Sequence, residues 1–185
     1  RHTANVFCRA IIMPNLDPPI TTINQAIEYK KRIIQSIPKG VSFYPLMTAY
    51  LTDDMSSEML ERGFKESVFY GAKLYPVNVT TNSSYGVTDL RKIDNLFETM
   101  ERIGMPLLIH GEVTDFNVDV FDREAVFIER HLEPLLRRFS SLKVVLEHIT
   151  TIDAIDFIEN SDFDIAATIT PHHLHINRNA MFNGG

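Results

Sequence analysis

The sequence predicts an α/β protein of the (β/α)8 TIM-like barrel class, with the barrel incomplete. Short apolar, β-branched runs alternate with helical patterns along almost all of the 185 residues. The runs are apolar without interruption, which is typical of parallel strands buried on both faces. A doubly wound sheet is the alternative architecture, although no Gly-rich first turn is present. The six strand-like runs are residues 9–15, 42–51, 71–76, 106–112, 143–150 and 164–171.

Helical patterns separate the runs. Thr22 can cap a helix with apolar residues at helical spacing, and Thr88 can cap another. Further helical patterns cover residues 56–67, 122–139 and 151–160. The apolar positions of the first two helices are Ile23, Ala26, Ile27, Ile33, Ile34 and Ile37, then Ile93, Leu96, Phe97 and Met100.

The length limits how much of a barrel the sequence can form. A complete eight-stranded barrel usually takes about 250 residues. We therefore expect about strands 2 to 7 of such a barrel, and one domain over residues 1–185, since no linker or internal repeat is visible.

Composition excludes several classes of protein. The net charge is −6 and no Lys/Arg stripe is present, which argues against a nucleic-acid surface. No apolar run approaches the roughly 18 residues of a membrane span. The single cysteine, Cys8, rules out an internal disulfide framework and is typical of a cytoplasmic protein.

Lys73 stands in an otherwise apolar strand-like run. Burial disfavours a charged amine and lowers its pKa from about 10.4. A neutral buried amine can react with carbon dioxide to give a carbamate, whose two oxygens can bridge two metal ions. The simpler interpretation is a lysine that reaches solvent at the barrel mouth or pairs with an acid such as Glu112.

Two histidines end the next two strand-like runs. His110 and His148 each follow four mostly apolar residues, and neutral imidazole is a favoured zinc ligand. Since barrel chemistry gathers at the carboxyl ends of strands, Lys73 and both histidines predict a metal site. Glu112 and Glu147 could orient these ligands, or could pair with helix residues.

Several ordered motifs resemble the dihydroorotase family, amidohydrolases of pyrimidine biosynthesis, in the shorter form typical of Gram-negative bacteria. The resemblance runs essentially from end to end, as a fragment lacking the first and last barrel strands. Its motifs are residues 9–16 (RAIIMPNL), 72–76 (AKLYP), 80–84 (TTNSS), 104–112 (GMPLLIHGE), 121–124 (FDRE), 147–151 (EHITT) and 166–171 (AATITP).

The resemblance implies a role for particular residues. Lys73 would be a carboxylated lysine bridging two zinc ions, and His110 and His148 would bind the second zinc. Asn15 would hold the substrate carboxylate, although the sequence alone slightly favours a turn-forming role beside Pro14. Thr80 and Thr81 match a mobile loop that closes over substrate, or else belong to a plain polar connection.

The sequence also departs from the family pattern. The first metal site of the family needs a His-x-His pair on the first strand, and none precedes Lys73. The only such spacing is His173-Leu-His175, and Pro171–His173 resembles a strand end, where we expect rim residues. The eighth-strand aspartate that handles the proton is absent; neither Asp162 nor Asp164 can replace it, because both precede the seventh strand.

The resemblance implies a zinc-dependent dihydroorotase for the parent protein, and we expect this 185-residue piece alone to be inactive without the missing ligands. The whole protein would interconvert N-carbamoyl-L-aspartate and L-dihydroorotate, act on no nucleic acid or membrane, and form a homodimer in the cytoplasm. Two alternatives stay open: another cyclic amidohydrolase of the hydantoinase or allantoinase type, and a non-catalytic homologue that serves as an assembly partner.

Overall fold

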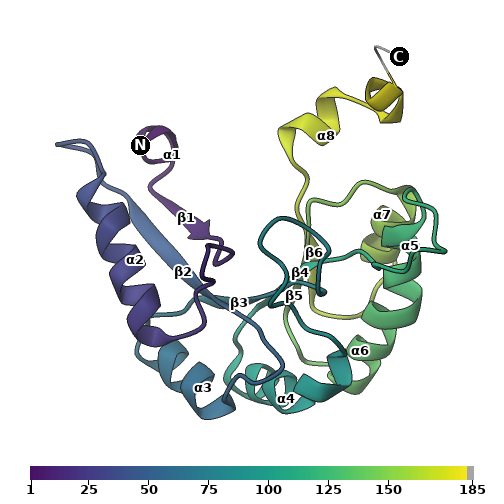
Figure 1. Ribbon diagram of the computed structural model, residues 1–185, viewed down its shortest axis with the longest axis horizontal. Helices are drawn as coiled ribbons and strands as arrows, with labels where there is room; N and C mark the ends of the chain where they lie inside the picture. Colours follow the sequence, from purple (N-terminus) through teal and green to yellow (C-terminus); the bar gives the residue numbers. More distant parts are fainter. Residues whose placement is uncertain (183–185) are drawn as a thin grey trace.

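Six parallel strands form one sheet in the order of the sequence (Figure 1). The computed structural model describes residues 1–182 of the chain. Each strand pairs with the next one along the chain, without the reversal of order that a doubly wound sheet requires. The predicted incomplete barrel is therefore confirmed. The strands are β1 (Arg9–Ile12), β2 (Tyr44–Tyr50), β3 (Gly71–Leu74), β4 (Leu107–His110), β5 (Val144–Glu147) and β6 (Ile165–Ala167).

The helices that lie between β1 and β6 in the sequence cover the convex side of this sheet, and its other side stays open between the two chain ends (Figure 1). These helices are α2 (Ile23–Gln35), α3 (Ser57–Lys65), α4 (Asp94–Ile103), α5 (Arg123–Phe127), α6 (Glu133–Arg138) and α7 (Ile152–Glu159). The remaining elements are α1 (His2–Val6), η1 (Leu90–Ile93), η2 (Ile128–Leu132), α8 (Pro171–His175) and η3 (Arg178–Phe182). No helix in residues 1–182 is long and apolar enough to cross a membrane.

Side-chain caps fix where three helices begin. Thr22 and Gln25 form a reciprocal capping box at the start of α2. Ser56 and Thr151 accept a backbone N–H at the starts of α3 and α7. The predicted cap at Thr88 is wrong: the Asp89 carboxylate caps η1 by accepting from the Arg91 amide at 2.9 Å, whereas the Thr88 hydroxyl donates to Asp53.

Other strand and helix boundaries also differ from the predicted ones. Every strand is shorter than its apolar run. Pro171 and His172 lie in α8 instead of ending a strand, since proline lacks a donor for the sheet and suits a first helical turn. The predicted 122–139 helix contains the π-helical stretch η2. This wider turn lies just before Pro134, whose ring would clash with a regular helix backbone.

Burial is deepest in the middle of the sheet. All four residues of β3 are buried, whereas β1 and β6 contain no buried residue. Helix side chains such as Leu60, Phe97 and Leu136 are fully buried against the sheet. The strands that carry Lys73 and His110 therefore lie in the best-packed part of the described chain.

Replacing Thr22 by alanine tests the capping box. The substitution removes the hydroxyl that accepts from the backbone amide of Gln25 at 3.3 Å. Caps of this kind contribute about 1 kcal/mol to the free energy of unfolding. Urea unfolding should show a loss of that size, while Thr22→Ser, which keeps the acceptor, should unfold like the parent. Equal losses in both variants would contradict the capping role.

Candidate metal and substrate site

Lys73 lies in the centre of the sheet with only 1% of its surface exposed. Its cross-strand neighbours are Tyr50 on β2 and Leu108 on β4. The Nζ atom donates to Glu147 Oε2 on β5, so the partner is Glu147 and not Glu112. Burial lowers the pKa of Lys73, while the charge of Glu147 acts in the opposite direction. A single carboxylate thus compensates a buried amine.

His110 and His148 lie side by side at the ends of β4 and β5. Their ring centroids are 4.6 Å apart. His110 Nε2 is buried without a hydrogen-bond partner in the described residues, and lies 3.5 Å from Glu112 Oε2. Burial, then the neighbouring His110 and Lys73, lower the pKa of His148 to about 4. His148 is therefore neutral at pH 7, which is the state that binds a metal ion.

The turn that carries His148 is held from two sides. His148 has a positive φ of 47°, and its N–H donates to Thr168 Oγ1 at 2.9 Å. The buried Glu124 carboxylate accepts from the amides of Thr150 and Thr151 at 3.0 and 2.9 Å, and from the Thr151 hydroxyl at 2.6 Å. Sequence reasoning gave Glu124 no role; the unpaired amides at the start of α7 are the signal that an acceptor is needed there.

Two buried tyrosines complete the surroundings of Lys73, and sequence reasoning missed both. The centroid of the Tyr75 ring lies 4.9 Å from Lys73 Nζ and 6.2 Å from the centroid of the His110 ring. Tyr50 stacks on Tyr75 at 5.2 Å. Burial raises the pKa of Tyr50 to about 12, and the pKa of Tyr75 is raised by burial as well. Both hydroxyls are therefore protonated at pH 7.

The three predicted substrate residues approach one another from different parts of the chain. Asn15 follows β1, and its Nδ2 lies 3.5 Å from the Thr81 carbonyl. Asn82 Nδ2 in turn donates to the Asn15 carbonyl at 3.1 Å. The exposed Thr80 and Thr81 hydroxyls make no hydrogen bond within the described chain. They are free to donate to an incoming anion.

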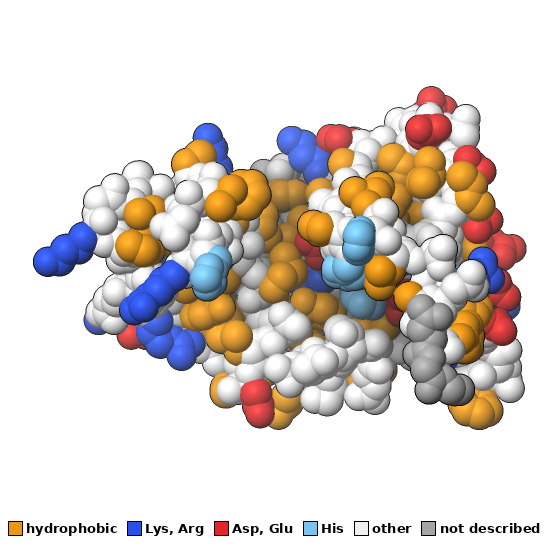
Figure 2. All heavy atoms as spheres, turned by 90° about the horizontal axis from the view of Figure 1, so that it is seen from above, with side chains coloured by type: hydrophobic (Ala, Val, Ile, Leu, Met, Phe, Trp, Pro, Cys, Tyr) orange, Lys and Arg blue, Asp and Glu red, His pale blue; other side chains and the backbone are white. Residues whose placement is uncertain are grey.

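The site residues fit a metal centre in part. Within residues 1–182 no three His, Cys, Asp or Glu side chains are placed to hold one ion. The available set is two adjacent imidazoles, one with an unpartnered ring nitrogen, and the buried amine of Lys73. An amine paired with a carboxylate is no ligand, but its carbamate would be. Figure 2 looks onto the open side and shows histidines beside an apolar hollow.

Similarity to known proteins extends over the whole chain, although no family model matches. The chain is 64% identical over 184 residues to the dihydroorotase of Synechococcus sp. (strain CC9605), covering 100% of this chain and 53% of that protein. It thus spans about half the length of the curated relatives it matches. The predicted resemblance to dihydroorotases is confirmed.

Solved structures agree with this resemblance. The dihydroorotase of Campylobacter jejuni matches with a TM-score of 0.88 and 38% identity, over 98% of this chain and 52% of that one. The dihydroorotase of Saccharomyces cerevisiae in complex with 5-fluoroorotic acid matches at 0.84 and 35%, over 95% and 52%. An L-hydantoinase from Arthrobacter aurescens reaches 0.73 at 16% identity, over 96% and 42%, which shows a shared fold only.

Replacing Glu124 by glutamine tests the support of the His148 turn. The amide cannot accept the same set of bonds, so buried donors lose partners, at a cost of about 1–3 kcal/mol. Hydrogen exchange at the Thr150 and Thr151 amides should accelerate. The exposed Glu129→Gln serves as the control, and slow exchange in both variants would show that the turn does not depend on Glu124.

The pH dependence of metal-free protein tests the environment of His148. The pKa of His148 is about 4 in the folded protein and about 6.5 in the unfolded chain. Between pH 4 and pH 6.5 the unfolded chain therefore binds more protons than the folded protein. The contribution of His148 to stability is therefore complete above pH 6.5 and is lost as the pH falls towards 4. NMR titration should give a midpoint near 4 for this imidazole, and His148→Gln should flatten the stability profile. A midpoint near 6.5 would contradict the burial.

Proposed function

We propose that the protein containing this chain is a dihydroorotase, which reversibly cyclises N-carbamoyl-L-aspartate to L-dihydroorotate in de novo pyrimidine biosynthesis. The observation that carries the proposal is the 64% identity to a dihydroorotase over all of a chain in which the His110 and His148 rings lie side by side and the Lys73 charge acts on His148. The more distant hydantoinase similarity, at 16% identity, supports that alternative less.

We assign the metal-binding part of the reaction to three residues. Carboxylated Lys73 would bridge two zinc ions, and His110 and His148 would be ligands of one of them. Bound zinc supplies Lewis acidity that polarises an amide carbonyl and acidifies water. Glu147 would give up its pairing with the Lys73 amine when that lysine is carboxylated. The remaining ligands and the proton-handling aspartate are to be sought in the half of the relatives that this chain does not cover.

We assign substrate binding to Asn15, Thr80 and Thr81. N-carbamoyl-L-aspartate and dihydroorotate both carry a carboxylate, which an amide N–H and two hydroxyls can bind. The contacts between Asn15 and the loop that contains both threonines support this assignment. Closing this loop would exclude water and place the carboxylate relative to the metal ligands.

The proposal extends to the setting of the enzyme. A metabolic enzyme acting on a small molecule fits a cytoplasmic location, and a homodimer is the expected assembly; neither nucleic acid nor a membrane would take part. Sedimentation of the full-length protein distinguishes a dimer from a monomer.

Assays of the full-length protein test the function. Purified protein should contain about two zinc ions per chain and should interconvert carbamoyl aspartate and dihydroorotate, with much lower activity towards hydantoin. Lys73→Ala should lower the zinc content below that of the parent protein and should lower kcat by about 100-fold, because it removes a shared ligand. The exposed Lys65→Ala is the matched control.

Two outcomes would contradict this function. Preferred hydrolysis of hydantoin would favour the other cyclic amidohydrolase. Full zinc content without activity on any cyclic amide would favour the non-catalytic homologue.

A further inference from the structure

The loop of residues 77–86, which follows β3, is folded on itself. Ser83 is buried, and its hydroxyl donates to the Thr80 carbonyl at 2.5 Å and accepts from the Thr80 amide at 2.9 Å. At the base of the loop the Val77 amide donates to the Val87 carbonyl at 3.1 Å. The Ser83 bonds keep the tip of the loop folded, whereas the Val77 bond joins the two ends of the loop and would break if the loop opened.

Three hydrogen bonds connect this loop to Asn15 and Tyr50 on the barrel. Two of them involve the exposed polar groups of Asn15, at 3.5 and 3.1 Å. The third runs from the Tyr50 hydroxyl to the Asn82 carbonyl at 3.3 Å, and Tyr50 is fully buried. Water readily replaces the partners of exposed groups, whereas a buried hydroxyl without a partner is costly. The Tyr50 bond therefore discriminates most strongly between a closed and an open loop.

The position of Tyr50 is fixed by the residues around Lys73. Tyr50 ends β2 as the cross-strand neighbour of Lys73. Its ring stacks on Tyr75 with an interplanar angle of 28°, and Tyr75 lies against the Lys73 amine. The two rings thus form a continuous packed connection from the candidate metal ligand to the loop.

We propose that Tyr50 is a positioning residue that holds loop 77–86 closed through the Asn82 carbonyl, with Tyr75 as its support. That the loop covers the substrate carboxylate rests on the proposed function, whereas the contact between Tyr50 and the loop does not. Because Tyr50 belongs to strand β2, it holds the loop in a fixed position relative to Lys73 and His110. It does so independently of the exposed bonds to Asn15.

Tyr50→Phe in the full-length protein tests this role. The variant keeps the ring and its stacking on Tyr75 and removes only the hydroxyl. Hydrogen exchange at the Val77 and Val87 amides, which lose their partners when the loop opens, should accelerate about two- to tenfold, the range expected for one hydrogen bond. The KM for dihydroorotate should rise by a similar factor, with smaller changes in kcat and with unchanged zinc content and thermal midpoint.

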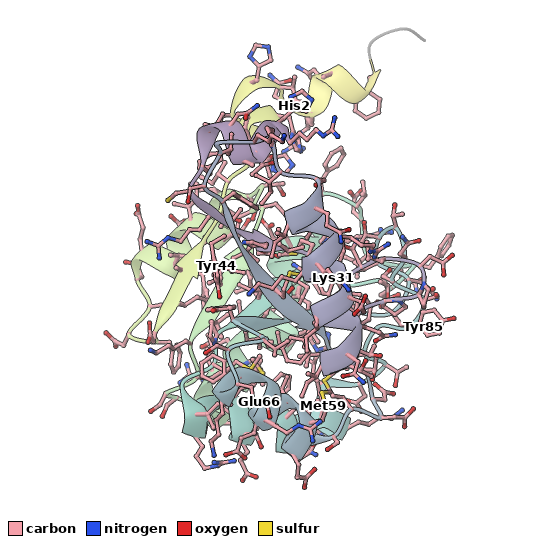
Figure 3. All side chains as sticks on the ribbon, turned by 90° about the vertical axis from the view of Figure 1, so that its left-hand side faces the viewer. His2, Lys31, Tyr44, Met59, Glu66 and Tyr85 are labelled. Carbon is pink, nitrogen blue, oxygen red and sulfur yellow. The ribbon has the colours of Figure 1, made fainter. Side chains whose placement is uncertain are left out.

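Tyr44→Phe is the matched control. Tyr44 begins the same strand, and its hydroxyl shares a 2.7 Å hydrogen bond with Tyr70, away from the loop. Figure 3 shows Tyr44 well separated from Tyr85, which belongs to the loop. Loop exchange and KM should match those of the parent protein.

The outcomes separate this proposal from the proposed function. Unchanged loop exchange and KM in Tyr50→Phe would overturn the role of Tyr50 and leave the dihydroorotase assignment standing. A lower thermal midpoint with loss of zinc would show a structural role instead, and would overturn it too. If the parent protein lacks dihydroorotase activity, the proposed function fails, while loop exchange in the two tyrosine variants still decides the role of Tyr50.

Discussion

The burial of Lys73 is the constraint on which the site depends. An amine in the middle of a packed sheet needs a compensating charge or a chemical change that alters it. Glu147 supplies that charge from β5. With its charge balanced by the Glu147 carboxylate alone, Lys73 can be held as an ammonium group. In the proposed function the pairing with Glu147 is given up, and Lys73 would be a carbamate whose negative charge zinc would balance.

The register of the parallel sheet explains why these residues meet. Residues paired across parallel strands point to the same face, as do residues two apart on one strand. Lys73 pairs with Tyr50 and Leu108, and His110, two residues after Leu108, pairs with Glu147. Four polar side chains thus share one face near the strand ends, with the helices covering the other.

The sequence predicted the strands and the meeting of Lys73, His110 and His148, because apolar runs mark strands and carboxyl ends of parallel strands lie at one edge. It named Glu112 as the possible partner of Lys73, whereas the structure pairs Lys73 with Glu147, since the partner depends on the register of the sheet. Tyr50 was missed because an aromatic residue in an apolar run is ordinarily core. Glu124 acts through the backbone amides of a distant turn, which no local pattern reveals.

The burial gradient across the sheet explains how an open sheet can keep this geometry. Lys73 is on the fully buried β3, and His110 ends the neighbouring β4, whereas the edge strands β1 and β6 are partly exposed. Packing constrains side chains most where neighbours surround them. The candidate metal residues are therefore fixed by central strands, and Asn15, which follows the edge strand β1, is fixed less. Its hydrogen bonds to the loop add the constraint that the edge lacks, so the substrate-binding half of the site depends on loop position while the metal-binding half does not.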